Sequence, residues 1–144
     1  MNQDTRELLS GIYKLSQTGI QAAKAVIPKT DSKQLRNELE EQLCDYSKAA
    51  ADTEQRLYKN DSAPKELNPI EKAVMWGSIE LHTITDTGKS HLAEIMINGT
   101  NMGIVDLTKT IGICKNAEPE VIDYARGFVK NEERHLNNLK AFLT

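Results

Sequence analysis

The sequence has little cysteine and no long apolar run. Its 144 residues include two cysteines, Cys44 and Cys114, which lie far apart and lack the CxxC spacing of zinc and redox sites. We interpret both as unpaired structural thiols in a reducing compartment. No apolar segment approaches the roughly 20 residues that span a bilayer, and the first residues lack the apolar stretch of a signal peptide. We therefore expect a cytoplasmic protein that does not associate with membranes.

Positive charge is not in excess either. The chain carries 18 Lys and Arg against 21 Asp and Glu, for a net charge of -3, and the two signs are interspersed. Without a basic field to gather phosphates, nucleic acid is not an expected partner. The length suits one domain with a substantial core, so we expect residues 1–144 to form a single helical-bundle domain.

Apolar residues recur at intervals of three and four along most of the chain, which predicts helices rather than strands. Polar residues mark their starts: Asp4 with Glu7 has the spacing of a capping box, Asp31 with Gln34 opens the second helix, and Ser90 can cap a later one. The predicted helices cover residues 4–27, 31–59, 69–86, 90–115 and 118–143.

One segment also fits a β-hairpin, because Asn98-Gly99 is a strong two-residue turn signal between apolar residues. The helical spacing continues past this turn, and an isolated two-stranded hairpin is marginally stable. We therefore predict a helix here, with Gly99 and Gly103 one turn apart on its inner face, where they permit close approach of a neighbouring helix.

The order of the helices predicts a topology. Short connections pair the first two long helices and the last two as antiparallel hairpins. The helix over residues 69–86, about 27 Å long at 1.5 Å per residue, can carry the chain back along a bundle about 37 Å long. The predicted fold is thus an all-α four-helix bundle with an up-down-down-up order and one helical crossover.

Glu132-x-x-His135 is the sharpest chemical pattern in the sequence. An acid and an imidazole three residues apart on a helix can bind one metal ion. Helical periodicity places Glu132 in the middle of the apolar stripe of the last helix and His135 at its edge. A buried carboxylate needs a partner, for which the sequence offers Gln42, Asn98 or Tyr46 inside the bundle.

In helix order, helix lengths and crossover, and in the segment Ser90–Lys109, the chain resembles ferritin-like proteins, especially short four-helix members from gut and anaerobic Firmicutes. Members that oxidise iron hold two metals with an inward Glu on the first and third helices and Glu-x-x-His on the second and fourth. Here Glu132 and His135 match that pattern. The second helix has Gln42-x-x-Asp45, the third offers Asp106 as its inward acid, and the first has no inward acid.

Three of the four ligand contributions are therefore altered or missing. The leading hypothesis is a non-catalytic ferritin-like bundle without a cofactor, acting through protein contacts or as a structural or stress-associated protein. The alternative is an iron- or manganese-binding oxidase or storage protein that uses Glu132 and His135, with Asp106 as a further candidate ligand.

The crossover helix has more apolar residues than one face can bury. Met75, Trp76 and Ile79 remain after a first set packs on the bundle. A residual apolar patch on a small protein usually marks an interface. We therefore expect a homodimer formed through this helix near Trp76.

Overall fold

The computed structural model describes residues 1–60 and 84–144, and helices account for most of both ranges. No strand occurs in these residues, so the prediction of an all-helical chain is confirmed for them. None of the helices in these ranges is long and apolar enough to cross a membrane. The elements are α1 (Gln3–Val26), the short 3-10 helix η1 (Ile27–Lys29), α2 (Lys33–Lys59), α4 (Lys89–Ile113) and α5 (Pro119–Lys140).

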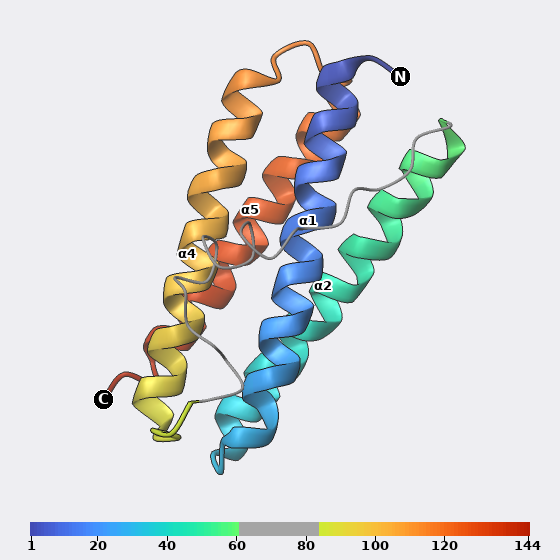
Figure 1. Ribbon diagram of the computed structural model, residues 1–144. Coiled ribbons are helices and arrows are strands. Elements are labelled where there is room, and N and C mark those ends of the chain that lie inside the picture. The colour runs from blue at the N-terminus through green and yellow to red at the C-terminus, as the bar shows by residue number, and fades with distance from the viewer. Residues whose placement is uncertain (61–83) are drawn as a thin grey trace.

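The four long helices pack side by side as two antiparallel hairpins (Figure 1). α1 packs on α2 and α4 packs on α5, while α1 also contacts α4 and α5, and α2 contacts α5. α2 ends and α4 begins at opposite ends of the bundle, so these two helices run in the same direction. The directions of the long helices therefore match the predicted up-down-down-up order.

Most of the predicted crossover helix, including Trp76, lies outside the described residues. Its expected last residues fall within them, and there the prediction is wrong: residues 84–88 are not helical. Asp86 instead folds back in a local turn, in which its Oδ1 accepts a hydrogen bond of 3.0 Å from the backbone N–H of Gly88. Such turns compete with helix formation.

The N-terminus of α1 is tied to the connection between α4 and α5. The predicted cap Asp4 is wrong, because Asn2 caps the helix by accepting a 2.8 Å bond from the Thr5 N–H. Asp4 instead accepts from the backbone N–H of Asn116 at 3.0 Å, and the Thr5 hydroxyl accepts from that of Glu118 at 2.8 Å. The polar residues of this first turn therefore stabilise the contact between the two hairpins.

Two other helix starts also differ from prediction by one or two residues. Ser32, and not Asp31, caps α2 through its side chain. Gly88 is the cap of α4, and Ser90 lies within the helix, where its hydroxyl donates to the carbonyl of Leu143 at 3.1 Å. Several polar residues at each start compete for one capping position, so periodicity locates the helix better than its first residue.

The alternative hairpin at Asn98-Gly99 is wrong, because α4 is a continuous helix through both residues. Gly99 and Gly103 are buried on its inner face, as predicted. A Cβ atom at Gly103 would lie 3.2 Å from the Leu15 Cδ2 atom of α1, so this glycine allows the two helices to approach closely.

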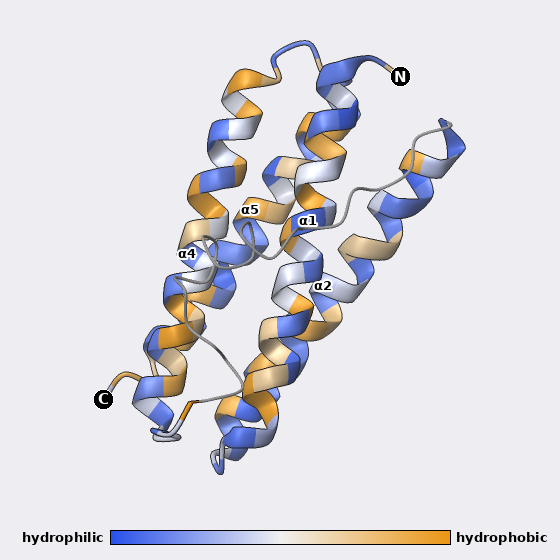
Figure 2. Ribbon diagram, in the orientation of Figure 1, coloured by the Kyte–Doolittle hydropathy of each residue, from blue (hydrophilic) through white to orange (hydrophobic). Residues whose placement is uncertain are grey.

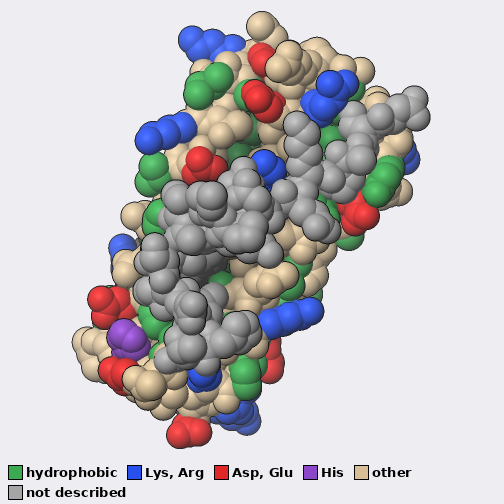
Figure 3. Space-filling view, in the orientation of Figure 1, with side chains coloured by type: hydrophobic (Ala, Val, Ile, Leu, Met, Phe, Trp, Pro, Cys, Tyr) green, Lys and Arg blue, Asp and Glu red, His purple; other side chains and the backbone are tan. Residues whose placement is uncertain are grey.

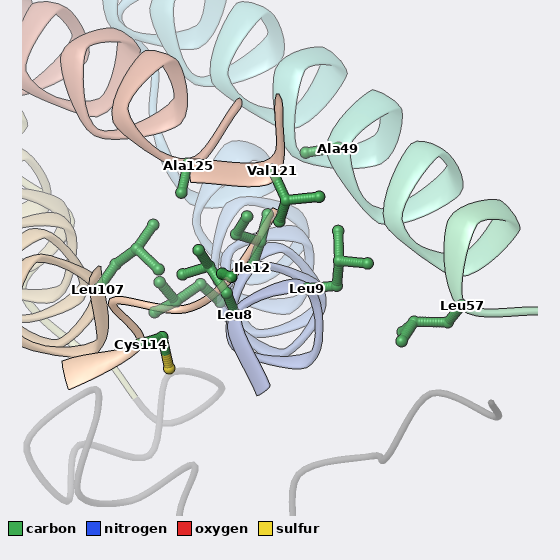
Figure 4. Packing of buried hydrophobic residues seen from close by; sticks show 11 residues of the cluster. Leu8, Leu9, Ile12, Ala49, Leu57, Leu107, Cys114, Val121 and Ala125 are labelled. Carbon is green, nitrogen blue, oxygen red and sulfur yellow. The ribbon is translucent and has the colours of Figure 1, made fainter. Parts of the chain in front are cut away.

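The apolar core is divided into two clusters, one toward each end of the bundle. In the first, Figure 4 shows side chains of α1 next to Leu107, Val121 and Ala125. The second lies toward the α1–α2 connection and contains Ala22, Val26, Leu35, Leu39, Leu92, Met96 and Leu139. In each helix the two clusters are separated by about two to four turns of chain, and buried polar residues occupy that interval.

Candidate functional site

A buried polar layer separates the two apolar clusters. Its side chains come from three helices, and each is at most 5% exposed: Gln42 and Tyr46 of α2, Thr100 of α4, and Glu132 and His135 of α5. The fourth helix, α1, contributes Gly19, whose backbone lies against the Tyr46 ring. We call this set the polar layer. It is the strongest candidate for a functional site because it gathers titratable groups away from water.

A chain of hydrogen bonds crosses the polar layer. The Gln42 amide Nε2 donates to the Thr100 hydroxyl at 3.0 Å and to the Tyr46 hydroxyl at 2.9 Å. The Tyr46 hydroxyl in turn donates a short hydrogen bond of 2.6 Å to Glu132 Oε2. This bond confirms the prediction of Tyr46 as a partner of Glu132. The network thus links α2 to both α4 and α5.

His135 lies between two carboxylates of α2. Its Nδ1 is 2.7 Å from Glu38 Oε1, and its Nε2 is 2.7 Å from Asp45 Oδ2. A neutral imidazole has one N–H, so hydrogen bonds to two ionised carboxylates require a second proton on the ring. The arrangement therefore suits an imidazolium between two carboxylates. Asn138 supports Glu38 with a 3.2 Å bond from its amide.

Burial raises the pKa of the Glu132 carboxyl from its ordinary 4.5 to about 7, and the charge of Asp45 acts in the same direction. The hydrogen bond from Tyr46 and the charge of His135 lower this pKa and offset part of the effect. Burial and the neighbouring Glu132 raise the pKa of Tyr46 well above 10. Tyr46 therefore keeps its proton and remains the donor to Glu132.

Asp45 has the opposite shift. Partial burial alone would raise its pKa, but hydrogen bonds from Asn131 and His135, together with the charges of His135 and Arg134, outweigh burial and lower the pKa below 3.8. The Asn131 amide donates to Asp45 Oδ2 at 2.8 Å, and Arg134 Nη2 lies 3.4 Å from the same oxygen. Asp45 is therefore the ionised acid of the site at neutral pH, while the pKa of Glu132 lies close to neutrality.

Gly19 has no side chain, and this leaves room for the Tyr46 ring in the polar layer. A Cβ atom on residue 19 would lie 2.6 Å from the ring atoms Cδ2 and Cζ, too close for van der Waals contact. We expect Gly19→Ala to displace Tyr46 from Glu132 and lower the free energy of unfolding by about 1–3 kcal/mol, measured by urea denaturation. Gly127→Ala is the matched control, because nothing lies within 4 Å of its added Cβ.

Alanine favours a helix interior over glycine by about 1 kcal/mol, so the control should be neutral or stabilising. A Gly19→Ala variant as stable as the Gly127→Ala control would contradict the proposed contact.

The structure brings together two of the three predicted metal ligands. Glu132 and His135 share the polar layer, but Asp106 is exposed and borders a groove between α1 and α4, beside Gly11 and Thr110. Its prediction as an inward acid is wrong, because its neighbour Leu107 takes the inward position. Within the described part of the chain, no group of three or more His, Cys, Asp or Glu side chains is arranged to hold a metal ion.

The sequence interpretation missed the partners of His135. The pattern Gln42-x-x-Asp45 contains one of these partners, Asp45, whereas Glu38 is not among the predicted residues. The available signal was their spacing: Glu38, Gln42 and Asp45 follow one another at four and three residues, which places them on one face of α2.

No protein-family model, curated protein or solved structure matches this chain.

Proposed function

We propose that this chain is a non-catalytic helical bundle that acts through contacts with other proteins, and that its polar layer is a structural element. The observation that supports this proposal most strongly is the engagement of His135, whose two ring nitrogens each face a carboxylate of α2 at 2.7 Å. A catalytic or metal-binding imidazole needs one nitrogen directed at a substrate or metal. Here both are used to join α5 to α2.

The polar layer can fix the register of the helices against one another. Apolar contacts alone tolerate sliding and repacking, whereas a buried hydrogen bond with one partner at one level does not. Tyr46 and Glu132 join α2 to α5, and Gln42 and Thr100 join α2 to α4. In this proposal, the bonds specify the alignment of the two hairpins at some cost in stability.

We further propose that the bundle has a ferritin-like plan. Two observations support it: α1 and α2, like α4 and α5, form antiparallel hairpins, and α2 and α4 run in the same direction. Two parallel consecutive helices require a connection that returns along the bundle. The segment predicted to form that crossover has the length to do so.

The alternative function is iron or manganese binding through Glu132 and His135. The observation in its favour is that both lie in one buried layer, close to the ionised Asp45. Metal binding would require His135 to lose a proton and exchange at least one carboxylate for the metal. It would also place a divalent ion next to Glu132, and Glu132 must be ionised to bind that ion.

Metal loading separates the two functions. The purified protein is incubated with Fe(II), Mn(II) or Zn(II), dialysed and analysed for bound metal, and the rate of ferrous oxidation is compared for wild type and Glu132→Ala. We expect bound metal well below stoichiometry and oxidation at the rate of the buffer alone. Stoichiometric metal or catalysed oxidation, lost in Glu132→Ala and kept in the exposed control Glu133→Ala, would overturn the non-catalytic proposal.

A further inference from the structure

α4 is apolar on two sides, and the bundle covers one of them. Its inner side buries Leu92, Met96 and Leu107. On the outer side, Met102 and Val105 are 38% and 45% exposed, respectively. Figure 2 shows apolar residues recurring along α4, and a helix that is apolar on opposite sides is usually covered on both.

The exposed residues form one stripe. Met102, Val105, Asp106, Lys109 and Ile113 are separated by three, one, three and four positions, and all are exposed, with Ile113 at 75%. At 1.5 Å per residue the stripe is about 16 Å long. Figure 3 shows hydrophobic and charged side chains alternating along the edge of the molecule where Figure 1 places α4. We call these five residues the α4 stripe.

The charges of the α4 stripe are arranged symmetrically about its centre. Asp106 and Lys109 lie between the two apolar ends, Met102 and Ile113. Within residues 1–60 and 84–144, neither Asp106 nor Lys109 makes an ion pair. A surface that is complementary to itself after a two-fold rotation is what a symmetric dimer requires.

We infer that the α4 stripe binds a second copy of this chain, with the two α4 helices antiparallel about a two-fold axis midway between Asp106 and Lys109. This axis sets Asp106 of each copy opposite Lys109 of the other. It also sets Met102 of each copy opposite Ile113 of the other. A parallel arrangement in register would place like charges together, so charge complementarity selects the antiparallel one.

The inference deepens the proposed function, on which it rests, by naming one of the protein contacts. A single helix from each copy gives an interface at the small end of the range for specific complexes. The dimer is therefore expected to be reversible and to depend on concentration.

Charge reversal tests the pairing directly. Sedimentation equilibrium is measured from about 1 µM to about 500 µM for wild type, Asp106→Lys and Lys109→Asp, and for an equimolar mixture of the two variants. Each variant alone places like charges opposite each other twice, so its dissociation constant should rise about tenfold or more. The mixture places opposite charges together at both positions and should dimerise at least as tightly as wild type.

Glu133→Lys on α5 is the control, because it makes the same change in net charge as Asp106→Lys at an exposed position away from the stripe. Circular dichroism verifies that each variant remains helical. A monomeric wild type, or a dimer that either single variant leaves intact, would overturn the inference. A dimer lost in Trp76→Ala but not in the charge variants would assign the contact to the predicted crossover helix. Each of these outcomes is independent of the metal-loading result.

Discussion

Replacing His135 with alanine is expected to lower the free energy of unfolding by about 3–5 kcal/mol near neutral pH. The imidazole is fully buried between Glu38 and Asp45. Its removal leaves two carboxylates facing a cavity without their shared cation. The side chain of Glu38 is 10% exposed and that of Asp45 is 36% exposed, so water can solvate the charge of Asp45 more readily. Most of the loss in the free energy of unfolding should therefore come from Glu38. Urea denaturation at constant pH measures the change.

Two comparisons identify the cause of that loss. His91→Ala, at a partly exposed position, should change stability by no more than about 0.5 kcal/mol. Combining His135→Ala with Glu38→Gln should recover part of the loss, because the stranded charge is then removed. A loss below about 1 kcal/mol in His135→Ala, or an additive double variant, would show that the imidazole does not compensate the two acids.

The raised pKa of Glu132 makes stability depend on pH. Between about pH 4.5 and pH 7 the folded protein holds a proton on this carboxyl that the unfolded chain has released, so stability falls as pH rises. The total fall is on the order of 3 kcal/mol, at about 1.4 kcal/mol per pH unit. Glu132→Gln retains an oxygen that accepts from Tyr46 and has no charge to bury. We therefore expect this variant to be more stable than wild type at pH 8 and similar to it at pH 5.

The measurement is a series of urea denaturations from pH 5 to pH 8 on wild type, Glu132→Gln and the exposed control Glu133→Gln. The control should retain the wild-type dependence on pH. Asp45 does not contribute to the change in stability between pH 5 and pH 8. Because its pKa is lowered, its contribution to the free energy of unfolding is complete above about pH 4 and is lost only on further acidification. A wild type whose stability is constant or increases between pH 5 and pH 7 would show that Glu132 is not held in its neutral form.

Most of the helices and their order could be predicted from the sequence, because the periodicity of apolar residues is a simple signal. α1, α2 and α5 alternate apolar and polar residues with helical periodicity, and short connections leave an antiparallel return as the natural solution. Predicted and observed helix ends agree to within about one turn. The caps were less predictable, because Asn2 and Asp4, or Ser32 and Asp31, are equally suitable by type and only packing decides between them.

The site was predicted only in part, for two physical reasons. Glu132 lies at the centre of an apolar stripe, so its burial and its need for a partner could be derived, and Tyr46 was among the candidates. Glu38 and Asp45 lie at the edge of the α2 stripe, where acids usually face water, and only their contact with α5 reveals their role. Asp106 was misplaced because α4 is apolar on two sides, and periodicity cannot identify which side faces the bundle.

Both ring nitrogens of His135 face carboxylates of α2, which leaves neither nitrogen for a metal or substrate. A heteronuclear NMR spectrum of the imidazole ring nitrogens, recorded at neutral pH before and after addition of Zn(II) or Mn(II), tests this arrangement most directly. We predict protons on both ring nitrogens, in slow exchange with water, and no selective change on adding metal. A ring with one proton, or a His135 signal that shifts or broadens stoichiometrically with added metal, would show that His135 is not held between the two acids of α2.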